Sequence, residues 1–353
     1  MIDITKRLGT WMKNKSKPST AKCNAEIYSS YLMSEPNNAS CLRLSEIMPE
    51  ISHDSVNRFL NRECFNGCDL FNENKSELDL VGGVLSVDDS VLDKLYSNPE
   101  HATLIDYYWS GKHHRAVKGI NLVTLFYTDV NGICLPVNYR IYDKSLDKTK
   151  NDYFREMLTE VISWGLKPRI VTGDSWYSGL MNLKHVRKSG LNFLFGVEKD
   201  RLISLEKGSY IKVSEMTEYS ENGKVVYLKE YGNVLVFRQL FKEAYRYYIM
   251  GVANLESLDS INYTDFKSTH DQHWQIECYH RALKQVCNIE RFQVRKSHAI
   301  RTHIYCALKA FCKLEIMKTK QIITNWYQVQ RQLFNKIIAE FIKHNSITGM
   351  AYA

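Results

Sequence analysis

The feature that most constrains the fold is a series of short, β-branched apolar runs that alternate with helical patterns between residues 80 and 200. Two of the runs flank Asp129-Val-Asn-Gly132, a typical hairpin turn, and therefore predict antiparallel neighbours. The order along the chain is three strands, a helix, a strand, a helix and a strand, which favours a mixed α/β sheet covered by helices. The expected strands are 84–89, 120–127, 133–141, 168–174 and 193–197, and the expected helices are 152–164 and 179–188.

The remaining regions differ in pattern. The N-terminal region is helical and poor in strands, a Tyr-rich β pattern follows the α/β region, and helical patterns resume at about 271–286 and 297–345. We therefore expect a helical unit at 1–78, an α/β core at 79–199 and 263–320, a β-rich insertion at 200–262 and a C-terminal helical segment at 321–353.

Composition excludes several classes of protein. Apolar residues make up 44% of the 353 residues, which is enough for a folded core and argues against disorder. No run of 18 apolar residues predicts a membrane-spanning helix, and the basic N-terminus lacks the apolar segment of a secretory signal. The nine cysteines are scattered singly and suggest reduced thiols, so we expect a cytoplasmic protein.

Basic charge is concentrated in two places. The segment 281–320 holds ten Lys and Arg against two acidic residues, an excess equal to the net charge of +8 of the whole chain. The first 22 residues form a second basic cluster, in which Asp3 is the single acidic residue. Such clusters suggest a polyanionic partner, although solvated helix faces have the same composition.

A helix-turn-helix pattern lies at about 42–62. Ser52 is a suitable N-cap for the second helix, whose apolar residues fall on one face. Asn57, Arg58 and Arg62 fall elsewhere on that helix, where they are available to contact base edges and phosphates. A plain helical hairpin has the same pattern and remains the alternative.

Three carboxylates lie at positions where α/β proteins commonly have their active sites, near the carboxyl ends of strands. Asp89 and Asp174 each follow an apolar strand pattern, and Glu277 lies on the helix after the insertion. Carboxylates that converge at strand ends bind hard divalent cations, and two Mg²⁺ ions ~4 Å apart support in-line phosphoryl transfer. Taken singly, a strand-end Asp is often a cap and a helical Glu is often solvated.

The helix with Glu277 also presents cations. Glu277, Arg281 and Lys284 are spaced i, i+4 and i+7 and share one face, so a carboxylate and two phosphate-binding cations lie together. An ordinary i, i+4 ion pair between Glu277 and Arg281 is the alternative interpretation.

The segment 273–285, His-Trp-Gln-Ile-Glu-Cys-Tyr-His-Arg-Ala-Leu-Lys-Gln, resembles the signature of bacterial DDE transposases of the insertion-sequence-four group and its relatives. That signature places Tyr, Arg, the catalytic Glu and Lys on one helix. Glu277 and Lys284 match the last two positions. His270 stands in place of Tyr and His273 in place of Arg, and histidine still donates a hydrogen bond.

Two further motifs carry the resemblance. Val87-Asp-Asp-Ser90 is similar to the first-Asp motif of the family, which makes Asp89 a better candidate than Asp88. Val171-Thr-Gly-Asp-Ser-Trp-Tyr177 is similar to the second-Asp motif and assigns Asp174.

The resemblance covers about residues 40–320 and implies an RNase H-like core whose three acids, Asp89, Asp174 and Glu277, hold two Mg²⁺ ions, with Mn²⁺ able to substitute. It implies a transposase that cuts transposon ends and joins them to target DNA as a homodimer, in the cytoplasm at a bacterial nucleoid. Implied DNA contacts come from His270, His273, Lys284 and Arg281. Trp274 is implied to stack on a displaced base, and packing in the core is the alternative for this ring. A catalytically silent DNA-binding descendant and a stand-alone metal-dependent nuclease are the alternatives.

Overall fold

The computed structural model describes residues 21–37, 39–99, 102, 104–206, 208–253, 258 and 261–347. The basic cluster predicted for the first 22 residues lies almost entirely outside the described residues. The chain forms two compact units. The sheet unit consists of the described residues of Gly67–Val91 and Asn121–Cys278, and the helical unit consists of those of Met1–Asn66, Leu92–Ile120 and Tyr279–Ala353.

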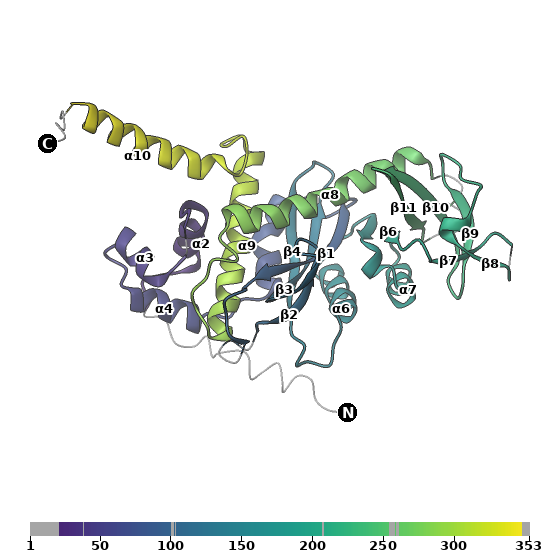
Figure 1. Ribbon diagram of the computed structural model, residues 1–353, viewed down its shortest axis with the longest axis horizontal. Helices are drawn as coiled ribbons and strands as arrows, with labels where there is room; N and C mark the ends of the chain where they lie inside the picture. Colours follow the sequence, from purple (N-terminus) through teal and green to yellow (C-terminus); the bar gives the residue numbers. More distant parts are fainter. Residues whose placement is uncertain are drawn as a thin grey trace. The chain divides into compact units, whose positions relative to one another are not determined.

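The sheet unit is built on a mixed sheet (Figure 1). From β3 onward its strand order is β3-β1-β5-β6-β11-β10-β9-β7-β8, and β4 also pairs with β3. Strands β1, β5 and β6 are parallel, whereas β3 pairs with β4 and β6 pairs with β11 in antiparallel fashion. The strands are β1 (Val84–Asp93), β3 (Arg115–Thr128), β4 (Cys134–Tyr142), β5 (Ile170–Gly173), β6 (Asn192–Val197), β7 (Leu202–Ser204), β8 (Tyr210–Lys212), β9 (Lys224–Leu228), β10 (Gly232–Phe241) and β11 (Ala244–Gly251). The five strands expected between residues 80 and 200 are confirmed.

Helices α5 (Gly67–Asn74), α6 (Lys150–Ser163) and α7 (Leu180–Lys188) pack on this sheet. Helix α6 begins with a capping box, in which the Thr149 side chain accepts from the Asp152 backbone and Asp152 accepts from the Thr149 backbone. The start of α6 is therefore defined by local sequence.

The segment at 200–262 forms strands β7 to β11 and continues the sheet beyond β6. Its core includes Leu235, Phe237 and Met250, which pack with Val84 of β1 and Phe266 of helix α8 (Tyr263–Val286). The rings of Phe237 and Phe266 are stacked with centroids 4.4 Å apart. This packing holds the first turns of α8 against the insertion strands.

Helix α8 begins at Tyr263, eight residues before the predicted start at about 271, so that prediction is wrong. The Asn262 side chain accepts hydrogen bonds from the backbone of Thr264 and Asp265, as an N-cap does. This cap is a local signal for a helix start at Tyr263, at the boundary that the sequence analysis placed between the insertion and the core.

The helical unit contains α2 (Ala25–Ser34), α3 (Cys41–Ile47), α4 (His53–Arg62), α9 (Ser297–Thr319) and α10 (Gln328–Ile347). Helices α2 and α4 pack against α9. The unit also contains β2 (Asp106–Ser110), which pairs with the first residues of β3 and was not predicted. Elements α8, β1 and β3 each continue from one unit into the other.

A buried polar chain links α2 to α9. The Tyr28 hydroxyl lies 3.0 Å from His303 Nδ1, and His303 Nε2 lies 3.0 Å from the Asn288 carbonyl oxygen. Because a carbonyl oxygen only accepts, Nε2 carries the proton and Tyr28 donates to Nδ1. Burial lowers the pKa of His303 to about 3, so the ring is neutral.

No helix among the described residues combines the length and apolar character needed to cross a membrane. The predicted fold class, an RNase H-like mixed sheet with helices and a β-rich insertion, is confirmed by the strand order and pairing. The division of the chain into four sequence parts stays a prediction.

Candidate active site

Asp89 lies in the second half of β1, and both of its carboxylate oxygens are bonded. Oδ1 accepts from Lys150 Nζ at 2.7 Å and from the Tyr177 hydroxyl at 3.0 Å. Oδ2 accepts from Asn121 Nδ2 at 2.6 Å. These donors come from helix α6, the turn after β5, and β3, so three segments orient one carboxylate.

The adjacent Asp88 points to the opposite face of β1, because successive side chains of a strand alternate. Its Oδ1 accepts from the Asp89 backbone at 2.7 Å. The parallel register pairs Val87 with Gly173, so the next position along each strand brings Asp88 level with Asp174. Asp88 and Asp89 thus lie on opposite faces of β1, and the charges of both act on Asp174.

Asp174 follows β5 directly and caps the turn Ser175–Tyr177, where its Oδ1 accepts from the Trp176 backbone at 3.0 Å. The residue before it must be glycine, since a Cβ on Gly173 would lie 2.8 Å from Val87 Cγ1. The close approach of β1 and β5 at this glycine places the Asp residues near one another.

The electrostatics of Asp174 reflect that approach. Asp174 keeps an exposed surface, but the protein around its carboxylate and the negative charges of Asp88 and Asp89 raise its pKa from 3.8 to about 7. The Lys150 ammonium and the hydrogen bond from Trp176 offset part of this rise.

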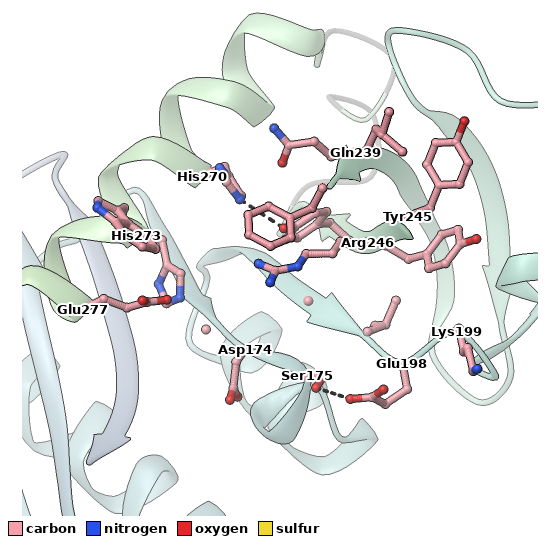
Figure 2. A pocket seen from close by; sticks show the side chains of 18 residues that line it. Asp174, Ser175, Glu198, Lys199, Gln239, Tyr245, Arg246, His270, His273 and Glu277 are labelled. Atoms are coloured by element: carbon pink, nitrogen blue, oxygen red, sulfur yellow. Dashed lines mark hydrogen bonds between the residues drawn. The ribbon is translucent and has the colours of Figure 1, made fainter. Parts of the chain in front are cut away.

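Asp174 and Glu277 line one pocket of about 530 Å³ within the sheet unit (Figure 2). Glu277 is exposed on α8 and lies 103 residues after Asp174 in the sequence. The same helix contributes His270, His273 and Trp274 to the pocket, and Trp274 is 49% exposed. The structure therefore brings five predicted site residues to one cavity.

Strands β10 and β11 of the insertion form another wall, which the sequence analysis did not anticipate. The Arg246 guanidinium lies 3.7 Å from the Phe241 ring centre and points into the pocket (Figure 2). Burial raises the pKa of Tyr248 and the nearby positive charge of Arg246 offsets part of that rise, while the Tyr248 hydroxyl lies 3.1 Å from His270 Nε2. The clue in the sequence was the basic and aromatic run Tyr245-Arg246-Tyr247-Tyr248 before the signature helix.

Two predicted DNA-binding cations of α8 belong to the helical unit. Arg281 is exposed, and Lys284 Nζ lies 3.4 Å from Glu290 Oε1. Both share helix α8 with Glu277. Their contact with DNA stays a prediction.

In the helix-turn-helix segment, the Ser52 side chain accepts from the Ser55 backbone at 3.2 Å, which confirms the predicted cap. The apolar face of α4 is buried, while Asn57, Arg58 and Arg62 are exposed. Helix α4 therefore presents the residues expected to contact DNA on its solvent side.

The donor set suits a hard divalent cation. Three carboxylates, Asp88, Asp89 and Asp174, lie close enough for their charges to interact, and a divalent cation relieves that repulsion. In the part of the chain that the structure describes, no three His, Cys, Asp or Glu side chains are already grouped as metal ligands. Lys150 instead neutralises Asp89.

The family model described as "Transposase DDE domain" matches residues 84–312, which is more than half of the chain. The protein therefore belongs to the DDE transposase family and is a DNA transposase, an enzyme class that cleaves and transfers DNA strands. Its assignment to the insertion-sequence-four group stays a prediction.

Among solved structures, the chain is similar to piggyBac transposase in a cryo-EM structure of its synaptic complex with hairpin DNA. The two share 12% sequence identity with a TM-score of 0.48, and the match covers 99% of this chain and 78% of that chain. The sequence matches none of the curated proteins compared with it.

Proposed function

We propose that this transposase cuts DNA at the ends of its element and joins them to target DNA in a phosphoryl transfer that depends on two Mg²⁺ ions, for which Mn²⁺ substitutes. One observation carries the proposal. Asp174 and Glu277 line one pocket, and the negative charges of Asp88 and Asp89 raise the pKa of Asp174. A clustered set of carboxylates is the donor chemistry that such ions require.

In this mechanism Asp89, Asp174 and Glu277 hold the ions. Ions held by these residues would supply Lewis-acid activation of the attacking oxygen and stabilisation of the charge on the leaving 3′ oxygen. Tyr177 and Asn121 hold Asp89 in position through hydrogen bonds of 3.0 and 2.6 Å, so its carboxylate is oriented before DNA arrives. The insertion strands β10 and β11 form one wall of the pocket that holds Asp174 and Glu277.

The remaining candidate residues bind DNA. Lys284 and Arg281 contact backbone phosphates near the cleaved bond, His270 and His273 donate hydrogen bonds at the pocket, and the exposed Trp274 ring stacks on an unpaired base. Residues on the solvent face of α4 contact transposon-end DNA outside the reaction site, namely Asn57, Arg58 and Arg62.

The partners are double-stranded DNA of the transposon ends and the target, together with a second copy of the chain. One element has two ends, so two active sites must be brought together on DNA. We place this activity in the cytoplasm, at the nucleoid.

The test is cleavage of DNA carrying the terminal repeats in Mg²⁺, comparing the wild type with Asp89→Asn, Asp174→Asn and Glu277→Gln. We expect cleavage and joined products from the wild type, and DNA binding without cleavage from each variant. Glu156→Gln is the matched control, because Glu156 is an α6 carboxylate bonded to Lys148 and should leave cleavage intact.

The same cleavage test distinguishes the two alternative functions. DNA binding without cleavage by the wild type in Mg²⁺ and Mn²⁺ would identify a silent DNA-binding descendant. Metal-dependent cleavage without joined products would identify a nuclease.

A further inference from the structure

Lys150 is a cation placed at the candidate catalytic acids that the proposed mechanism does not yet use. It is the first residue of α6, and its Nζ lies 2.7 Å from Asp89 Oδ1. The two side chains are 19% and 15% exposed, respectively, so the ion pair is largely shielded from solvent but open on one side. A cation in this position is next to any phosphate that reacts at Asp89.

Asp89 does not need Lys150 to satisfy its oxygens. The Tyr177 hydroxyl donates to Oδ1 and Asn121 Nδ2 donates to Oδ2, so each oxygen keeps a donor if the ammonium leaves. A purely structural counter-ion usually completes the bonding of a buried carboxylate that is otherwise left unpaired. Here the ammonium is an addition to a carboxylate that two neutral groups already hold.

The location of Lys150 on α6 is also unfavourable for the helix. The partial positive charge at a helix N-terminus favours acidic residues in the first turn and opposes a lysine there. The capping box of Thr149 and Asp152 begins the helix without any contribution from Lys150. A residue that opposes its local electrostatics without stabilising the element is expected at a functional site.

The Lys150 ammonium also lies beside an exposed aromatic ring. Lys150 Nζ lies 4.7 Å from the centre of the Trp176 ring, which is 60% exposed. The flexible four-carbon side chain can therefore leave Asp89 and remain close to an aromatic face at the edge of the site.

We propose that Lys150 is a DNA-contacting residue of the phosphoryl-transfer site: its ammonium occupies Asp89 Oδ1 in the free protein and contacts a backbone phosphate oxygen when DNA is bound. This inference rests on the proposed function. The departure of the ammonium leaves the Tyr177 hydroxyl on Oδ1 and opens the other acceptor position of that oxygen when the site must hold a divalent cation. Substrate arrival and exposure of the carboxylate are thus linked through one side chain.

The first test measures the salt dependence of DNA affinity for the wild type, Lys150→Met and Lys148→Met, in the absence of divalent metal. A lysine that contacts a phosphate contributes ~0.9 to the slope of log K against log salt, so Lys150→Met should lower the slope by that amount. Lys148 lies two residues before Lys150 and pairs with Glu156, and Lys148→Met should leave the slope unchanged. An unchanged slope for Lys150→Met, or an equal fall for both variants, would overturn the proposal.

The second test measures binding of Mn²⁺ alone to DNA-free protein. Removal of the competing ammonium should give Lys150→Met a lower dissociation constant for Mn²⁺ than the wild type. An equal or higher constant contradicts the proposed occupancy of Oδ1. Thermal unfolding of each variant verifies that it is folded.

The third test measures single-turnover cleavage at saturating DNA. We expect Lys150→Met to lose about 100-fold in rate, as is typical when one electrostatic donor is removed, and Lys150→Arg to restore the salt slope and part of the rate. Wild-type-like cleavage by Lys150→Met would refute the role. If the wild type itself does not cleave, the proposed function fails, while the salt and Mn²⁺ measurements still decide the role of Lys150.

Discussion

Removal of the Asp174 charge should stabilise the folded protein at alkaline pH, although it abolishes cleavage. The folded-state pKa of Asp174 is raised from 3.8 to about 7. The protonated form is thus favoured in the folded state, and the free energy of unfolding falls as pH rises from about 4 to 7. Above pH 7 the cost of the ionised carboxylate is fully present.

The size of the effect follows from that shift. Each pKa unit corresponds to 1.36 kcal/mol, so the full shift would amount to about 4 kcal/mol. Because part of Asp174 is exposed, solvent screens its charge, and we expect about 1 to 2 kcal/mol. Asn is neutral at every pH and still accepts the hydrogen bond from the Trp176 backbone.

The assay is urea unfolding of the wild type and Asp174→Asn at pH 5 and pH 8, without divalent metal. The variant should gain stability over the wild type mainly at pH 8, whereas Asp200→Asn, which changes an exposed carboxylate after β6, should show no such pH dependence. Addition of Mg²⁺ at pH 8 should stabilise the wild type by mass action and leave Asp174→Asn nearly unchanged. A difference between the two proteins that is equal at both pH values, or a destabilised variant at pH 8, would refute the reasoning.

Three other substitutions test separate parts of the molecule. Asp89→Asn should abolish metal-dependent cleavage with DNA binding retained, and loss of cleavage in Asp88→Asn but not in Asp89→Asn would show that the assignment between the neighbours is wrong. Tyr28→Phe removes the donor to buried His303 Nδ1 and should lower the free energy of unfolding by about 1–3 kcal/mol in urea titrations; an unchanged value would contradict the buried hydrogen bond. Arg246→Gln should reduce DNA affinity at low salt and lower its salt slope by ~0.9, and an unchanged slope would argue against a phosphate contact.

Local patterns predicted most of the sheet unit. The apolar runs that became β1, β3, β4, β5 and β6 are recognisable because strands buried on both faces consist of continuous β-branched and aromatic residues. The beginning of α8 was not recognised, because its first turns pack on Phe237 from a strand about 30 residues earlier. That contact is long-range, and the local signals, the Asn262 cap and one buried aromatic at Phe266, are short.

The sequence by itself determined the chemistry of this protein: an apolar strand that carries Asp89, a strand end followed by Asp174, a helix that carries Glu277, and the motifs that relate them to DDE transposases. These features are local, since each depends on a few consecutive residues. Tertiary structure alone decided which side chains share a cavity. It brought Arg246 to the pocket and Lys150 to Asp89, because the pairing of β11 with β6 and the start of α6 beside β1 join segments that are distant in sequence.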